Sequence, residues 1–217
     1  YDHVNLYANS PVETQFRFQR APWLVAGKST AEVLWENITL TTRALRRRAE
    51  IREIGFRSPG GFHQGLNGRE DLQKMLQELG YTWVSTKYPP HQSGTPRERP
   101  GEEVFQDIVR AQSEAQPFVY PTGLVEIPMS PISDVTAFRS HFWPRDDFLE
   151  ATRRAVQWAI ERGKVFDFLA HPSCLVVEDP EFETIRLICD LVERAGDRGE
   201  LTTLDKIAAR WQASRNG

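Results

Sequence analysis

The sequence predicts an α/β protein in which helices alternate with short apolar strands along a largely parallel sheet. Segments with helical periodicity alternate with short runs rich in β-branched and aromatic residues. The intervals between these runs are long enough for a helix, and such crossovers are right-handed and join parallel strands. The 217 residues suit one sizeable domain, so we expect a single domain over 1–217.

Composition restricts the class of partner. The formal net charge of −3 argues against a nucleic-acid partner. Arginines cluster over 43–48 but follow a helical pattern beside Glu50, which indicates a solvated helix face. Cys174 and Cys189 make neither a disulfide framework nor a cysteine-based metal site. No run approaches the roughly 18 apolar residues of a membrane span. The compartment and a homo-oligomeric state stay open.

Six segments have helical periodicity, and two of them carry recognisable ends. Ser29 and Glu32 have the spacing of a capping box. Asn67 is expected to cap the second helix with Glu70 three residues on, and Gly80 stands where a left-handed C-cap belongs. The six expected helices lie at 30–48, 68–79, 101–112, 146–162, 182–194 and beyond 204.

Five short apolar runs are expected as strands. They lie at 51–56, 81–84, 118–120, 124–128 and 165–170. The Pro-rich stretch 89–100 has neither apolar period and predicts a long loop, a kind of segment that is often functional in a compact domain. His63, His91 and His141 fall in loops, where we expect them to face solvent or substrate.

Two of the expected strands end in reactive side chains. The run 51–56 leads into Arg57, which Pro and Gly residues follow, and the run 165–170 leads into His171. In sheets wound by helices, ligands bind outside the carboxyl ends of the strands. Arg57 and His171 are therefore expected at the functional site.

These segments resemble motifs of the polysaccharide deacetylases, the carbohydrate esterases named for a nodulation-factor deacetylase homology domain. Residues 57–59, Arg-Ser-Pro, are similar to the family's Arg-x-Pro motif, and residues 169–171, Leu-Ala-His, to its late Leu-x-His motif. Residues 1–3, Tyr-Asp-His, resemble the end of its metal-binding motif, His-(Ser/Thr)-x-x-His, with His3 as the second histidine. The resemblance covers essentially the whole chain and depends on the order of three short motifs.

The resemblance implies a distorted (β/α) barrel that is incomplete at the N-terminus. It implies a metal-dependent hydrolase of non-peptide C–N bonds, with a divalent metal, zinc first, and with N-acetylated sugars of polysaccharide or peptidoglycan as substrates. The family's first metal-binding histidine and its Asp-Asp motif would lie upstream of Tyr1. The chain as given would then lack the catalytic Asp pair and be inactive alone.

The resemblance also implies a role for each motif residue. His171 would protonate the departing nitrogen as a general acid, and Arg57 would orient the catalytic carboxylate. Pro59 would hold the turn while the Gly60 amide donates to the oxyanion. His3 would be a metal ligand.

Three positions extend or depart from the family pattern. Gly60 replaces the aromatic residue that usually follows the Pro, and Phe62 is expected to bind substrate in its place. Glu126 is a carboxylate inside an apolar run and is expected to line the cleft or meet Arg57. Pro172 follows the histidine where many members have Asp, as in the branch with putative peptidoglycan deacetylases and imide or allantoin hydrolases.

Simpler interpretations stay open beside these. His171 could be a satisfied core histidine, Arg57 the partner in a structural salt bridge, and His3 a surface residue. Trp83 is expected in the core, because no Asp matches the family's Asp and Trp motif there. For the whole chain, the alternatives are a non-catalytic carbohydrate-binding module and, within the same fold, a hydrolase of cyclic amides or imides such as allantoin.

Overall fold

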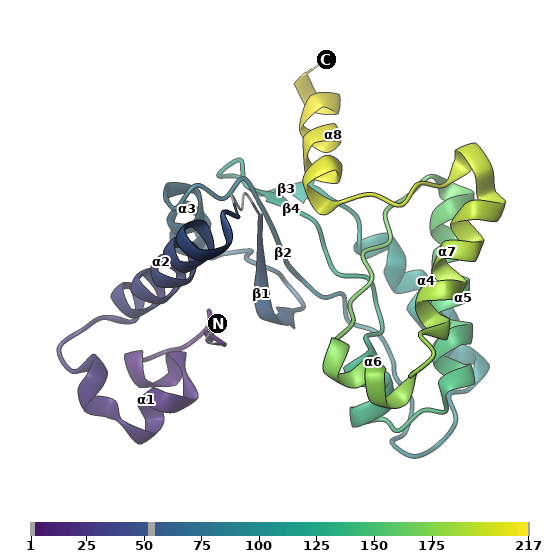
Figure 1. The fold of residues 1–217 in the computed structure, drawn as a ribbon, viewed down its shortest axis with the longest axis horizontal. Coiled ribbons are helices and arrows are strands. Elements are labelled where there is room, and N and C mark those ends of the chain that lie inside the picture. The colour runs from purple at the N-terminus through teal and green to yellow at the C-terminus, as the bar shows by residue number, and fades with distance from the viewer. Residues whose placement is uncertain (1–2, 52–54, 217) are drawn as a thin grey trace.

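The computed structural model describes residues 3–51 and 55–216, and side chains as far as residue 213. Its centre is a four-stranded sheet in the order β1-β2-β4-β3 (Figure 1). The first three strands in this order are parallel, and β3 runs antiparallel to β4. The strands are β1 (Gly55–Phe62), β2 (Trp83–Lys87), β3 (Phe118–Val119) and β4 (Val125–Glu126).

The barrel implied by the family resemblance is wrong, because the sheet is open and mixed. The run 165–170, expected as a strand, has no regular secondary structure and lies outside the sheet. A side chain takes the place of a neighbouring strand at its start: the amide of Gln116 accepts from the Val165 N–H (3.0 Å) and donates to the Val165 carbonyl (3.0 Å). These bonds satisfy the backbone of Val165 without a strand ladder.

Strand β1 continues through the segment that was expected to end it. The register pairs 55–57 with 83–85 and then shifts before Phe62 pairs with Lys87. Gly60 has a φ of 79° inside this irregular stretch, the left-handed conformation that a glycine adopts at little cost. Residues 52–54 of the expected strand lie outside the described residues.

The predicted helices are confirmed within a few residues, and two more helices appear. The second helix begins at Glu70, which was expected at its third position. Arg69 therefore stands at the N-cap in place of Asn67, and the backbone N–H groups of Asn67 and Arg69 are bonded in the preceding turns. Neither α1 nor α6 was expected. The helices are α1 (Phe16–Arg20), α2 (Thr30–Ala49), α3 (Glu70–Glu78), α4 (Glu102–Ala111), α5 (Arg145–Arg162), α6 (Pro172–Glu178), α7 (Glu183–Ala195) and α8 (Leu204–Asn216), with one π-helical turn, η4 (Val135–Ser140).

The two largest apolar clusters of the described residues form separate parts of the core. One lies between the sheet and helices α2 and α3, and the other between α4, η4, α5 and α6 (Figure 1). Trp83 belongs to a third, smaller cluster in which Val125 and Ile127 meet Ala208 of α8. Trp83 is buried, which confirms the expectation that it is a core residue, and its indole N–H donates to Asp205 (2.7 Å).

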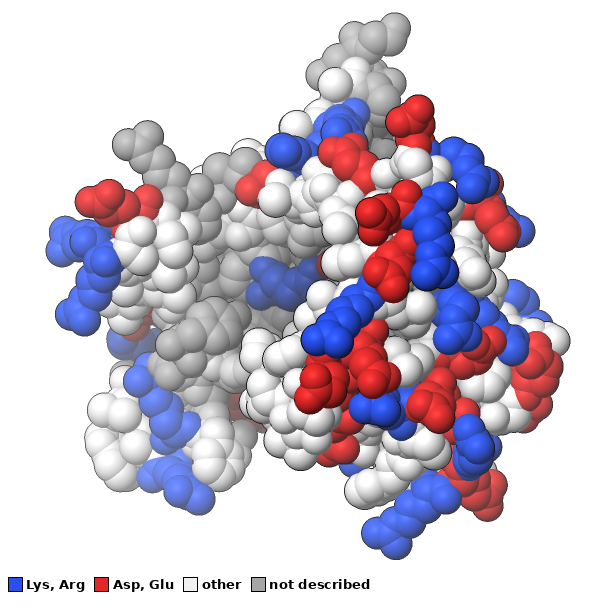
Figure 2. Space-filling model, turned by 45° about the vertical axis from the view of Figure 1, so that its right-hand side comes forward, with Lys and Arg blue, Asp and Glu red and all other residues white. Residues whose placement is uncertain are grey.

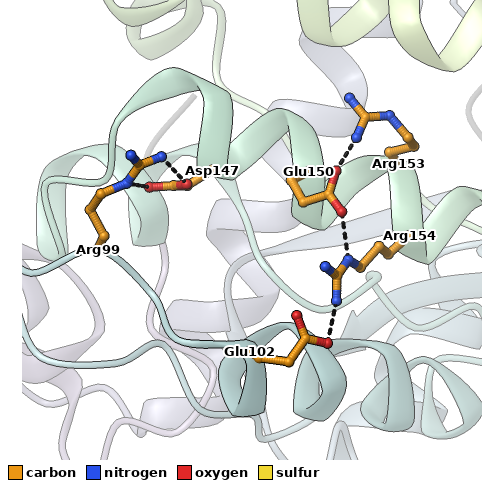
Figure 3. A network of polar contacts seen from close by, with 6 residues as sticks. All are labelled: Arg99, Glu102, Asp147, Glu150, Arg153 and Arg154. Carbon is orange, nitrogen blue, oxygen red and sulfur yellow. Dashed lines mark hydrogen bonds and ion pairs between the residues drawn. The ribbon is translucent and has the colours of Figure 1, made fainter.

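Ion pairs join the end of the 89–100 loop and helix α4 to α5 (Figure 3). The guanidinium of Arg99 binds the Asp147 carboxylate through two bonds of 2.9 and 2.7 Å. Arg154 of α5 bonds to Glu102 of α4 (2.7 Å) and to Glu150 (2.6 Å). The Glu102 end of the network is exposed, and exposed pairs stabilise little individually, whereas the Asp147 carboxylate is buried. Their bidentate and networked geometry nevertheless keeps the loop end in register with α5.

The outer helices carry charges of both signs. Figure 2 shows basic and acidic side chains interspersed over the side of the molecule formed by α5 and α7. Residues Arg43 and 46–48 of α2 are exposed, as the helical pattern indicated. No helix in the ranges 3–51 and 55–216 combines the length and apolar character that crossing a membrane requires.

The capping box of α2 gives a test of the local structure. The Ser29 hydroxyl accepts from the Glu32 N–H (3.3 Å), and the Glu32 carboxylate accepts from the Ser29 N–H (2.7 Å). Ser29→Ala should lower the free energy of unfolding by about 1 kcal/mol in urea denaturation. Ser10 precedes a 3₁₀ turn without a capping bond from its side chain, so Ser10→Ala should change stability by less than about 0.5 kcal/mol. Equal effects would contradict the capping assignment.

Candidate functional site

Arg57 of β1 forms an ion pair with the buried carboxylate of Asp167. In the sheet, Arg57 stands opposite Ser85 of β2. The Ser85 hydroxyl donates to the same carboxylate oxygen of Asp167 (3.2 Å). One carboxylate therefore joins β1 and β2 to the segment 165–170.

The backbone of Asp167 is tied to the chain that leaves β4. The Asp167 N–H donates to the Ser130 hydroxyl (2.9 Å), and the Ser130 N–H donates to the Asp167 carbonyl (3.1 Å). Burial raises the pKa of Asp167, and the adjacent Arg57 charge acts against that rise. A buried carboxylate of this kind depends on its cation, because removal of one partner leaves the other charge without compensation.

His171 is held by a second buried carboxylate, that of Asp134. The imidazole Nδ1 lies 2.8 Å from Asp134 Oδ1, and the His171 backbone N–H donates to Oδ2 (2.7 Å). Asp134 is fully buried, whereas 47% of the His171 side chain is exposed. Because a carboxylate accepts, Nδ1 carries the proton, and Nε2 is not used in the bond to Asp134.

Local structure explains why Asp134 points at His171. Asp134 precedes the π-helical turn η4, and its carboxylate also accepts from the Val135 N–H (2.8 Å). His171 precedes α6, whose first residue is Pro172. The Cys174 thiol lies beside the carboxylate, and burial followed by the Asp134 charge raises the pKa of that thiol, so it remains a protonated donor.

The two ion-paired groups belong to one short segment. Asp167 and His171 are four residues apart, so their Cα atoms are at most about 14 Å apart even in a fully extended chain. Arg57 is bound to Asp167, four residues before His171, whereas His171 is bound to Asp134. No direct bond joins Arg57 to His171.

Glu126 is part of the core. It is fully buried, and its oxygens accept from the Thr86 N–H (2.6 Å), the Thr86 hydroxyl (2.7 Å), the Lys87 N–H (2.8 Å) and the Tyr120 hydroxyl (2.7 Å). Burial raises the pKa of Glu126, and these donors oppose the rise. Glu126 therefore joins β2 to β4, and Asp167 has the contact with Arg57 that was expected of Glu126.

The remaining motif residues of β1 lie beyond the ion pair. Pro59 and Gly60 form the irregular stretch, where the Ser58 hydroxyl donates to the Gly60 carbonyl (2.6 Å). A side chain added at Gly60 would meet no atom within 4 Å, so the space beside it is open. The Phe62 ring packs at 4.5 Å from the Tyr7 ring and is half-buried.

His3 is exposed at the start of the described chain. Within residues 3–51 and 55–216, no group of three or more His, Cys, Asp or Glu side chains is placed to hold a metal ion. The described residues therefore do not by themselves fit the zinc site that the resemblance implies. Such a site needs three protein ligands, and within the chain the resemblance assigns that role to His3 alone.

No family model matches the chain, and no curated protein and no solved structure matches it either.

Sequence reasoning missed both carboxylates that organise the site. Asp167 stands inside the apolar run 165–170, the same signal that drew attention to Glu126. Asp134 follows Pro131 and Ser133 in a segment without apolar periodicity, and its 37-residue separation from His171 leaves no local trace of their pairing.

The contacts of Glu126 give a prediction about stability. Glu126→Ala should lower the free energy of unfolding by several kcal/mol, because each orphaned buried donor costs about 1–3 kcal/mol. Glu126→Gln should cost much less. Since the pKa of folded Glu126 lies above its ordinary value of 4.5, the folded state binds that proton more tightly than the unfolded state does. Stability should then fall as pH rises from 4.5 through the raised pKa.

Urea denaturation at several pH values measures this slope. The wild-type slope should be steeper than that of Glu126→Gln, which keeps the shape and has no proton to lose. Asp190→Asn, an exposed change on α7, serves as the control and should follow the wild type. A Glu126→Gln curve parallel to the wild type would contradict the assignment.

Proposed function

We propose that the chain supplies the proton-transfer and orienting groups of a hydrolase that cleaves non-peptide C–N bonds. The observation that carries the proposal is the bond between the exposed imidazole of His171 and the buried carboxylate of Asp134. A histidine oriented in this way through Nδ1 has Nε2 free to exchange a proton with a substrate at neutral pH. The order of the three motifs along the sequence supports the same reaction class.

The chemistry assigned to His171 is protonation of the departing nitrogen. Breaking an amide C–N bond leaves an electron pair on nitrogen, which must be protonated as the bond breaks. In the protonated imidazole, Nε2–H donates that proton while Nδ1–H remains bonded to Asp134. Asp134 stabilises the charged imidazolium and fixes the direction of Nε2, as a buried carboxylate does beside a catalytic histidine.

Arg57 is proposed to orient an anionic or strongly polar group next to this acid. The ion pair with Asp167 uses Nη2, and a guanidinium has five N–H donors in a planar fork. Nearly a third of the Arg57 side chain is exposed. The donors that face away from Asp167 can bind a carboxylate or the carbonyl oxygen of a substrate.

The proposed substrates are N-acetylated sugars of polysaccharide or peptidoglycan. The resemblance of residues 57–59 and 169–171 to deacetylase motifs supports this class. Pro172 after the histidine favours the branch that includes cyclic amide hydrolases, so small cyclic amides are the second class to assay. The open space beside Gly60 and the exposed imidazole of His171 suit a substrate that approaches from solvent.

The proposal predicts that Asp134 acts through His171. In the product of the complete reading frame, His171→Ala should lower kcat by about 10²- to 10⁴-fold, the usual contribution of a general acid. Asp134→Asn should also lower kcat, and the double variant should be no slower than His171→Ala alone, because the two residues form one unit. Acetate release from acetylated chito-oligosaccharides and ring opening of cyclic amides are the assays.

Asp190→Asn is the matched control, since it removes an exposed carboxylate of α7 far from this pair in sequence. It should retain the wild-type kcat. Additive losses in the double variant would contradict a joint role for Asp134 and His171. Wild-type kcat in His171→Ala would refute the proposed function, and so would a complete protein that turns over neither class of substrate.

A further inference from the structure

The loop over 89–100 contains a half-buried histidine that the proposed reaction does not use. His91 packs edge-on against the ring of Tyr88, with centroids 5.2 Å apart. Its Nδ1 lies 2.9 Å from the Pro89 carbonyl oxygen. Its Nε2 accepts from the backbone N–H of Ile132 (3.3 Å), in the segment that leads to Asp134.

These partners allow one protonation state of the His91 ring. A carbonyl oxygen can only accept, so Nδ1 carries a proton. A backbone N–H can only donate, so Nε2 must present its lone pair to Ile132. The Tyr88 hydroxyl, 3.5 Å from Nε2, donates toward it and accepts from the Ser133 N–H (3.0 Å). A proton added at Nε2 would face the Ile132 N–H and break this arrangement.

Ile132 is a position where such a restraint matters. Its φ is 63°, a left-handed conformation that is unfavourable for a β-branched residue. The side chain is buried in the cluster of α4 and α5. A strained backbone of this kind persists only where surrounding contacts hold it. Two residues later stands Asp134, the carboxylate that binds His171.

We propose that neutral His91 is a positioning residue for the Asp134–His171 pair, which it holds by accepting from the strained backbone of Ile132. Protonation of His91 would release residues 132–133 and loosen Asp134. The inference depends on the proposed function, because it assigns pH sensitivity to the same site. The proton-transfer site would then be most ordered at pH values above the pKa of His91.

The charged and titratable groups around His91 are consistent with a neutral ring. Burial is the main cause that lowers the pKa of His91. His63, which follows β1, and His141, at the end of η4, lower that pKa further, and the Pro89 carbonyl and the Asp107 carboxylate of α4 raise it. Asp107 also accepts from the Gln92 N–H (2.7 Å) and pairs with Arg110, so its charge is partly satisfied.

Amide hydrogen exchange in the 217-residue chain tests the restraint. After correction for intrinsic rates, exchange at Ile132 and Ser133 should speed up by at least about tenfold between pH 7.5 and a pH at which the nitrogen shifts of His91 show its ring protonated, as the loss of a buried hydrogen bond requires. His91→Gln should remove this pH dependence, because the amide oxygen can accept from Ile132 and does not titrate. His63→Gln should keep the pH dependence but move its midpoint to higher pH, because His63 contacts the Tyr88 carbonyl (3.1 Å) and its charge is one of the causes that lower the pKa of His91.

The imidazole nitrogen shifts of His171 supply a readout that a purely structural role would not move. In the wild type, they should change at the pH where His91 titrates, and this change should be absent in His91→Gln. Its absence in the wild type would overturn the positioning role. Exchange at Ile132 that does not change with pH in the wild type would overturn the restraint itself, whether or not His91→Gln folds.

Neither measurement requires turnover. An intact restraint in a protein without hydrolase activity would leave the positioning of Asp134 and His171 by His91 standing and would refute the proposed function, and with it the link to proton transfer. An active hydrolase in which the nitrogen shifts of His171 do not change when His91 titrates would refute only this inference.

Discussion

The buried carboxylate of Asp134 is the constraint on which the candidate site depends. A charge without solvent must be met by donors, and Asp134 meets the N–H groups of Val135 and His171 and the His171 imidazole. Two of these donors belong to a residue 37 positions away in the sequence. Satisfying the carboxylate therefore places the start of α6 against the start of η4 and aims the His171 ring at the same time.

The second carboxylate, Asp167, explains how a segment outside the sheet has a defined position. Residues 165–170 lack a strand ladder, so side chains must hold them. Gln116 binds the first residue, Arg57 and Ser85 bind Asp167, and Asp134 binds the residue after the last. Because each bond is to a different element, displacement of the segment would leave several buried polar groups unsatisfied.

Much of the secondary structure could be predicted from local signals. The capping spacing of Ser29 and Glu32 and the periodicity of residues 146–162 both correspond to observed helices. The sheet arrangement was less accessible, because an apolar run such as 165–170 has the same local pattern whether a strand or the amide of Gln116 pairs with it. Tertiary contacts decide this, and the barrel inferred from the motifs was accordingly wrong.

The candidate site shows the same division between local and distant information. Arg57 and His171 could be selected because each follows an apolar run, and the structure connects both to segment 165–171. Their partners could not be assigned from sequence, because a carboxylate's partner is set by burial and distance in the fold. Glu126 illustrates the limit: its apolar surroundings suggested a cleft, whereas four donors hold it in the core.

The protonation pattern of the His171 ring tests the central claim most directly. Long-range proton–nitrogen NMR near pH 7.5 distinguishes the two neutral tautomers of an imidazole. In the wild-type chain His171 should carry its proton on Nδ1, and Asp134→Ala should shift the ring toward a mixture of both tautomers. A wild-type ring protonated on Nε2, or a tautomer that is indifferent to the loss of Asp134, would contradict that claim.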